Sequence, residues 1–189
     1  MGKIVATEFM TLDGVMEAPG GEDSLGALGG WSFLFWNDEA MKFKFDELFA
    51  SDALLLGRKT YEIFAAAWPS ITDETGFADQ MNSLPKYVVS TTLKAAEWNP
   101  SSLINTHVAE TVSRLKQQHG QDILICGSAD LVNTLMEHDL IDEYRIMLFP
   151  IVLGKGKRLF SDGNHKTLKL TDTKTLSSGV AILTYQPAR

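Results

Sequence analysis

Short apolar runs and longer segments with an apolar residue every three or four positions follow one another along most of the chain. The runs predict buried strands, and the longer segments predict amphipathic helices. Strands are expected at 3–10, 53–56, 86–91, 103–105, 122–126, 141–150, 167–176 and 180–186. Helices are expected at 38–50, 59–67, 73–84, 109–119 and from 127 to about 138. This alternation predicts an α/β fold whose last two strands, joined by a turn at 177–179, form a β-hairpin.

The junction between the second strand and its following helix carries the first candidate chemistry. The apolar run 54–56 ends at Gly57, and Arg58, Lys59 and Thr60 open the helix. A helix N-terminus presents unpaired backbone N–H groups and a partial positive charge, which attract a phosphate. Glycine allows a ligand close to the backbone, while the two cations add charge. The pattern favours an anionic-cofactor site, and a plain junction with solvated basic residues stays as the alternative.

A second junction of the same kind follows strand 122–126. There Gly127, Ser128, Ala129 and Leu131 lie in the stretch that opens the following helix. Two strand–glycine–helix junctions on one sheet are what a nucleotide cofactor spanning the sheet edge would use. No Gly-x-Gly-x-x-Gly sequence follows the first strand, so the ordinary dinucleotide-binding fold is not supported.

Polar residues also end the first and third predicted strands. Ser90 and Thr91 can hydrogen-bond a phosphate or a ribose if their strand end lies beside Gly57, and an ordinary polar strand terminus is the alternative. Asp13 stands in an Asp-Gly turn after the first strand. It is either a turn residue or a carboxylate at the mouth of the sheet that orients a substrate or takes part in proton transfer.

Two glycine-containing segments have no regular pattern. Segment 17–37 is aromatic, and its rings either wall a pocket for a flat ligand or serve in packing. These rings are Trp31, Phe33, Phe35 and Trp36. Segment 151–160 is basic and hinged by glycines, so it is either a flexible loop with solvated lysines or a lid that contacts a substrate phosphate. Both alternatives stay open for both segments.

Composition narrows the class of protein. The 189 residues fit one globular domain spanning 1–189, and the net charge of -7 disfavours nucleic acid as a partner. The single cysteine, Cys126, excludes an intramolecular disulfide, fits a reducing compartment and is expected to pack as a small hydrophobe. No membrane-spanning run or secretory signal is recognised, so a cytoplasmic location is expected. The four histidines share no metal-ligand spacing, and no metal site is expected.

Taken in order, these motifs resemble a known family. The stretch from Leu55 to Glu62 looks like the cofactor-binding turn of dihydrofolate reductase, and Ile125 to Leu131 occupies the place of that fold's second glycine turn. The match is closer to the reductase domain of the bifunctional riboflavin-biosynthesis deaminase-reductase. Further shared features are Thr11-Leu12-Asp13-Gly14, Leu140-Ile141-Asp142-Glu143, Pro150 and Leu153-Gly154-Lys155-Gly156. Together they extend from Lys3 to Tyr185.

The resemblance implies a dihydrofolate reductase-like three-layer fold, with a mixed, mostly parallel sheet of about eight strands flanked by helices, and a homodimer. It implies that NADPH phosphates would be bound by Gly57, Arg58, Lys59 and Thr60, with Ser90 and Thr91 near the 2′-phosphate. It implies contacts to the pyrophosphate and the nicotinamide from Gly127, Ser128, Ala129 and Leu131. Asp13 would face the substrate.

The chain departs from the family's pattern in two respects. Gly127-Ser128 stands where the family commonly has two glycines, so the backbone is expected to approach the cofactor less closely. The sequence also contains no zinc-ligand cluster of a deaminase, so a substrate of the riboflavin pathway does not follow from the resemblance.

The sequence therefore predicts an NADPH-dependent reductase that transfers hydride to a C=N or C=O group of a small heterocyclic or sugar-derived substrate. This activity would be similar to that of 5-amino-6-(5-phosphoribosylamino)uracil reductase or dihydrofolate reductase. The alternative is a non-catalytic dimeric protein that binds a nucleotide or a pterin-like ligand.

Overall fold

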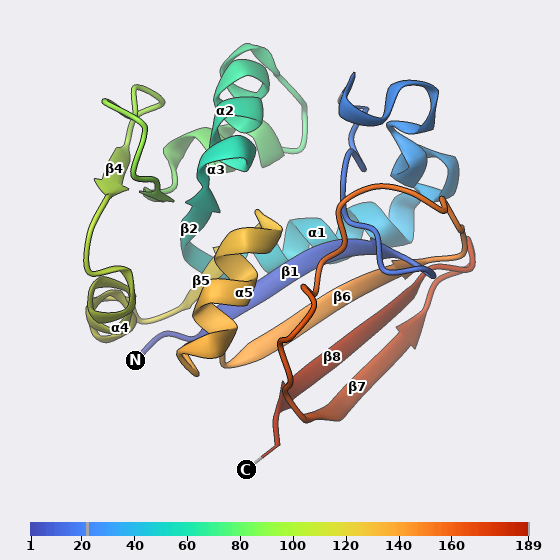
Figure 1. Ribbon diagram of the computed structural model, residues 1–189. Coiled ribbons are helices and arrows are strands. Elements are labelled where there is room, and N and C mark those ends of the chain that lie inside the picture. Colours follow the sequence, from blue (N-terminus) through green and yellow to red (C-terminus); the bar gives the residue numbers. More distant parts are fainter. Residues whose placement is uncertain (22, 189) are drawn as a thin grey trace.

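The computed structural model describes residues 1–21 and 23–188, which form one eight-stranded sheet in the order β4-β3-β2-β5-β1-β6-β8-β7 (Figure 1). The strands are β1 (Ile4–Thr11), β2 (Ser51–Gly57), β3 (Lys86–Val89), β4 (Ser101–Ile104), β5 (Asp122–Ile125), β6 (Glu143–Phe149), β7 (Leu168–Thr175) and β8 (Ala181–Pro187). Strands β1 to β6 pair in parallel, and β8 is antiparallel to both β6 and β7. The expected mixed sheet and C-terminal hairpin are confirmed.

Helices cover both faces of this sheet and make three layers (Figure 1). They are α1 (Asp38–Phe49), α2 (Arg58–Ala67), α3 (Phe77–Ser83), α4 (Val108–Gln118) and α5 (Ala129–Glu137), with short 3-10 helices at Asp23–Leu28, Trp31–Phe35 and Trp68–Ser70. Alternate residues of the strands face opposite layers, because successive side chains of a strand point to opposite sides. On β1, Ile4 packs with α4 and α5, whereas Val5 packs with α1, α2 and α3.

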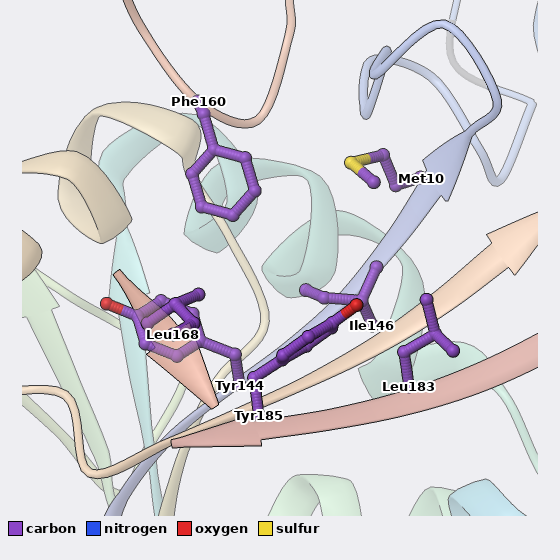
Figure 2. Close-up of a pocket in the computed structure, with 7 residues that line it drawn as sticks. All are labelled: Met10, Tyr144, Ile146, Phe160, Leu168, Leu183 and Tyr185. Atoms are coloured by element: carbon purple, nitrogen blue, oxygen red, sulfur yellow. The ribbon is translucent and has the colours of Figure 1, made fainter. Parts of the chain in front are cut away.

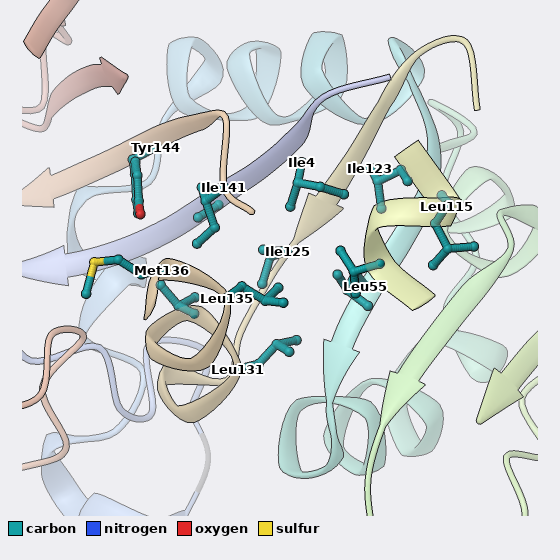
Figure 3. Packing of buried hydrophobic residues seen from close by; sticks show 14 of the residues in the cluster. Ile4, Leu55, Leu115, Ile123, Ile125, Leu131, Leu135, Met136, Ile141 and Tyr144 are labelled. Atoms are coloured by element: carbon teal, nitrogen blue, oxygen red, sulfur yellow. The ribbon is translucent and has the colours of Figure 1, made fainter. Parts of the chain in front are cut away.

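The core under α4 and α5 fixes the position of α5 against the middle of the sheet (Figure 3). Ile123 and Ile125 of β5 are fully buried there, together with Leu135 of α5. Burying a large aliphatic side chain contributes roughly 1.5–3 kcal/mol. The start of α5 is therefore held firmly beside the carboxyl end of β5, where the second glycine junction lies.

Some of the aromatic rings of segment 17–37 pack against the sheet. Trp31 is 2% exposed and makes an edge contact with Phe149 of β6, at 5.2 Å between ring centroids. Phe35 also contacts that ring, whereas Phe33 is 64% exposed. Packing therefore accounts for Trp31 and Phe35, and Phe33 is left at the surface.

The boundaries of α3 differ from the sequence-based expectation. A helix expected over 73–84 begins at Phe77, because the Asp73 carboxylate accepts hydrogen bonds from the backbone N–H groups of Phe77 and Ala78. Asp73 thus stands before the first turn and satisfies its free donors instead of continuing the helix. Over the described ranges, no helix combines the length and the apolarity needed to cross a membrane.

Candidate functional site

The two glycine junctions lie side by side at the carboxyl edge of the sheet. Strands β2 and β5 are parallel neighbours, with Leu55 opposite Ile125. Each strand is followed directly by its junction and helix, so α2 and α5 begin at the same edge. The Gly57 backbone N–H donates to the Gly127 carbonyl oxygen at 3.0 Å, which joins the two junctions.

Each junction needs a glycine because the other junction fills the space beside it. A Cβ at Gly57 would lie 2.9 Å from the backbone nitrogen of Ser128. A Cβ at Gly127, where φ is +101°, would lie 2.6 Å from Thr60 Oγ1. The Gly127–Ser128 peptide bond is cis. The serine that departs from the family's pattern is accommodated because its side chain lies against a position that lacks a Cβ.

Both helices present free backbone donors at this edge. The capping positions of α2 and α5, Gly57 and Ser128, make no side-chain cap in the described structure. The first N–H groups of a helix have no acceptor inside the helix, so these two ends can together bind an anion. Asp130 adds a negative charge to the first turn of α5, but Lys157 pairs with it at 2.6 Å.

The cations of the first junction differ in their surroundings. Arg58 pairs with Glu62 one turn along α2, at 3.0 Å, and both side chains are partly exposed. Lys59 is exposed and makes no ion pair with any residue in 1–21 or 23–188. Lys59 can therefore meet a ligand directly, whereas Arg58 has to exchange its carboxylate partner for a phosphate.

The polar end of β3 reaches the same edge, since Val89 lies opposite Gly57. The strand ends at Val89 and not at Thr91, because the Ser90 hydroxyl oxygen accepts from the backbone N–H of Leu93 at 3.0 Å and of Thr92 at 3.2 Å. Ser90 is buried in this turn, whereas Thr91 is exposed. The structure thus brings both residues beside α2, with Thr91 the more accessible of the two.

Asp13 fastens a loop to the end of β1. Its carboxylate accepts from the Thr11 hydroxyl at 2.6 Å and from the backbone N–H groups of Leu153 and Gly154 at 3.2 and 2.7 Å. These hydrogen bonds, that of Thr11 first, lower the pKa of Asp13 to about 2. The group is ionised at neutral pH and its oxygens are occupied, which favours a positioning role over proton donation.

Segment 151–160 is accordingly held in place along its length. Lys157 donates its backbone N–H to Glu17, and Leu159 is fully buried. A cavity of about 300 Å³ lies between this loop and the end of β1. It is lined by Asp13, Val15, Gly154, Lys155, Gly156 and Arg158.

A second cavity, of about 200 Å³, lies on the α5 side of the sheet between β1, β6 and the terminal hairpin (Figure 2). Its lining is apolar apart from two tyrosine hydroxyls: Met10, Tyr144, Ile146, Phe160, Leu168, Leu183 and Tyr185. Figure 2 shows Phe160 reaching from the loop after β6 toward the strand residues. Burial raises the pKa of Tyr144 to about 12, so this hydroxyl stays neutral.

Sequence reasoning missed a buried carboxyl next to the second junction. Glu8 of β1 is 4% exposed, and its Oε1 atom has no hydrogen-bond partner among the described residues. Burial raises the pKa of Glu8 to about 8, although Lys44 and the Gly127 backbone N–H lower it. An acidic residue inside the first apolar run was the available signal, because a charged residue is seldom buried without a partner.

A buried ionic cluster on the α1 side was missed as well. Lys44 donates to Thr7 Oγ1 at 2.8 Å and to Glu47 at 2.6 Å, and Arg145 approaches the other Glu47 oxygen at 3.3 Å. Burial lowers the pKa of Lys44, but Glu47 and other neighbouring charges outweigh it and leave that pKa raised. Cys126 lies nearby, and burial raises its thiol pKa to about 12, in keeping with the expected packing role.

Known proteins resemble this chain over its whole length. Among solved structures, one from Shewanella sp. PV-4, described as a candidate riboflavin biosynthesis protein, has a TM-score of 0.78 at 19% identity, with both chains fully covered. Dihydrofolate reductase from Enterococcus faecalis, complexed with NADP(H), has a TM-score of 0.61 at 15% identity and covers 100% of this chain and 98% of its own. These likenesses show a dihydrofolate reductase-like fold, as the sequence predicted.

Sequence comparison identifies the family. The uncharacterised protein YyaP of Bacillus subtilis strain 168 is 34% identical over 187 residues, covering 97% of this chain and 94% of its own. The uncharacterised protein YwjB of the same organism is 34% identical over 132 residues, covering 69% and 71%. The family model of the RibD C-terminal domain matches residues 2–183. The chain therefore belongs to the RibD C-terminal domain family, with a reductase-type fold.

Proposed function

We propose that this protein is an NADPH-dependent reductase that transfers hydride to a C=N or C=O group of a small heterocyclic or sugar-derived substrate. The observation that carries the proposal is the packing of the two glycine junctions, at Gly57 and Gly127, which sets the uncapped starts of α2 and α5 side by side. Such a paired set of backbone donors suits a pyrophosphate. The fold and the family support the same reading.

The residues of this edge fit the cofactor in type and place. Lys59 and Arg58 supply positive charge for the phosphates, and Thr91 offers an accessible hydroxyl beside them for the 2′-phosphate. Gly127 lets the two helix starts lie close together, because a Cβ at this position would meet Thr60. NADPH would supply the hydride, while the protein would bind the cofactor, orient it and exclude water.

Asp13 belongs to the proposal as a positioning residue. Its carboxylate sets the conformation of the loop at 153–154, which lines the polar cavity with Lys155 and Arg158. The two cations suit an anionic group on the substrate, and the cavity lies at the end of β1, beside the same edge of the sheet. This arrangement supports a substrate that carries a negative charge, such as a phosphate.

Titration with NADPH and NADH tests the cofactor assignment. Quenching of intrinsic tryptophan fluorescence, with energy transfer to the nicotinamide, would give both affinities. We expect micromolar binding of NADPH with weaker binding of NADH, since the second cofactor lacks the 2′-phosphate. Absence of binding, or equal affinity for the two, would remove NADPH from the proposal and leave the fold unaffected.

We also propose a homodimer in the cytoplasm, and the family resemblance supports the dimer. Sedimentation equilibrium of the purified protein would give the mass in solution. A mass twice that of one chain is expected, and a mass equal to one chain at micromolar concentration would contradict the dimer.

A further inference from the structure

One buried group at the candidate site has no part in the function proposed so far. Glu8 lies in the middle of β1 with its backbone opposite Ile146 of β6. On the other side of β1, the pairing with β5 ends at Ala6 opposite Ile125. Glu8 therefore lies just beyond the last residue of β5, beside the chain segment that contains Gly127.

The direction of the Glu8 side chain follows from the alternation of β1. Ala6 packs in the core under α4 and α5, so Glu8, two residues later, faces the same layer. The Gly127 backbone N–H interacts with its carboxyl. The carboxyl thus lies under the start of α5, and its Oε1 atom is buried without a partner among the described residues. A buried polar atom without a partner is costly, which singles out this carboxyl among the buried groups at the junction.

We propose that Glu8 couples its own protonation to the redox state of the bound nicotinamide cofactor, so that the ionised carboxylate strengthens binding of the oxidised form. This inference rests on the proposed cofactor site. The oxidised nicotinamide ring carries a positive charge that the reduced ring lacks. The proposal requires the nicotinamide ring to lie at the second junction, beside Gly127. In a buried site of low effective dielectric, a carboxylate next to the ring distinguishes its two forms more strongly than it would in water.

Charged groups on both faces of the sheet act on Glu8 and leave its protonation adjustable near neutral pH. From α1, Lys44 lowers the pKa of the carboxyl and Glu47 raises it, while Gly127 lowers it through its backbone N–H. Cys126 stays a neutral thiol because burial raises its pKa to about 12. With burial as the largest effect, the pKa of Glu8 is raised to about 8. Glu8 is therefore mostly protonated before the cofactor binds at neutral pH.

The sign of the expected effect follows from linkage. A positive ring beside Glu8 lowers its pKa, so NADP⁺ binding releases a proton in the range just below about pH 8. The affinity for NADP⁺ then rises with pH in that range. The total rise is about tenfold for each unit by which the ring lowers the pKa of Glu8. NADPH lacks the ring charge and gains nothing from ionisation. The ratio of the NADP⁺ to the NADPH dissociation constant should therefore fall as the pH rises.

Measurement of both dissociation constants between about pH 6 and about pH 9 tests this inference. The ratio is the useful quantity because both cofactor forms share the 2′-phosphate, whose own titration near pH 6 then cancels. Calorimetry in buffers of different ionisation enthalpy counts the released protons directly. A proton released by NADP⁺ but not by NADPH, near pH 7.5, is the expected result.

Variants separate Glu8 from other titrating groups. In Glu8→Gln the ratio should become independent of pH and proton release should disappear. Glu137→Gln, at the other end of α5 and exposed, makes the same chemical change away from the junction and should behave as the wild type. If the role of Glu8 is purely structural, Glu8→Gln should weaken the binding of both cofactors equally, and the ratio of the two dissociation constants should still depend on pH. That result would overturn the inference.

The outcomes also distinguish the inference from the function on which it rests. If neither cofactor binds the wild type, the proposed function and the inference fail together. If both bind with a ratio that is constant with pH, the reductase proposal stands and the inference fails. If Glu8→Gln does not fold, the number of protons that the wild type releases on binding NADP⁺ tests the inference. The absence of proton release overturns it.

Discussion

The Thr60 hydroxyl of α2 lies against Gly127 of the second junction, where a Cβ would be 2.6 Å from Thr60 Oγ1. The contact joins two segments that are far apart in the sequence and sets the distance between the two helix starts. Any side chain at position 127 has to push α2 away from α5. The proposed binding of a cofactor by paired backbone donors would therefore depend on this glycine.

Gly127→Ala is expected to lower stability and to weaken NADPH binding together. The added Cβ meets Thr60, and the backbone φ of +101° is strained for alanine. We expect a loss of about 2–4 kcal/mol in the free energy of unfolding, measured with urea, and at least a tenfold loss of NADPH affinity.

Gly76→Ala is the matched control for this change. Its φ is +80°, but nothing lies within 4 Å of the added Cβ. It should lose only about 1 kcal/mol of stability, the cost of the backbone conformation, and retain NADPH affinity. Equal effects of the two substitutions would show that the contact between Thr60 and Gly127 contributes nothing.

Joint substitution of Arg58 and Lys59 by alanine should weaken the binding of NADPH much more than the binding of NADH. A charge-assisted hydrogen bond to phosphate is worth about 1.5–3 kcal/mol, so about 10- to 100-fold is expected for NADPH. Fluorescence titration with both cofactors measures the difference. Lys169→Ala with Lys174→Ala removes the same charge from the exposed strand β7 and should leave both affinities unchanged. Equal losses for NADPH and NADH would mean that Arg58 and Lys59 bind phosphates common to both cofactors and make no contact with the 2′-phosphate.

The ion pair within α2 predicts a gain of affinity. Glu62 holds Arg58 at 3.0 Å, and the pair is partly exposed, so it is worth no more than about 1 kcal/mol. Glu62→Gln releases Arg58 for the cofactor and should raise NADPH affinity by up to about fivefold, with little change for NADH. The same titration measures it, and lower NADPH affinity would show that Glu62 orients Arg58 toward the ligand.

Local pattern predicted most elements and both glycine junctions, because strand–glycine–helix order is visible in consecutive residues such as Leu56, Gly57 and Arg58. It did not predict which residues from different strands lie next to each other in the sheet. That Glu8 lies beside Gly127 depends on strand order, which brings β1 next to β5. The Asp73 cap likewise shortened α3 through a contact that helical periodicity does not contain. The first feature depends on the register between strands. The second depends on a side chain that binds the backbone N–H groups at the start of the helix. Composition predicts neither.

Asp13→Asn should loosen the loop after β6. The amide offers one acceptor oxygen where the carboxylate offers two, so the N–H groups of Leu153 and Gly154 lose part of their bonding. Faster hydrogen exchange at these two amides is expected. The folded-state pKa is lowered from 3.8 to about 2, so the wild-type loop should loosen as the pH falls through that range. Asp162→Asn, on the exposed loop before β7, should leave both amides unchanged, and unaltered exchange in Asp13→Asn would show that the carboxylate does not hold the loop.

Stability against pH tests the burial of Glu8 without any cofactor. Its pKa is raised from 4.5 to about 8, so a folded Glu8 keeps its proton over a range in which the unfolded chain ionises. The wild-type free energy of unfolding should therefore fall, relative to Glu8→Gln, by up to about 1.4 kcal/mol per pH unit between these values, and the difference should be constant above about pH 8. Urea unfolding of both proteins from about pH 5 to about pH 9 measures it. A difference that stays constant over that range would mean that Glu8 is already ionised in the folded protein, with Lys44 as its compensating charge.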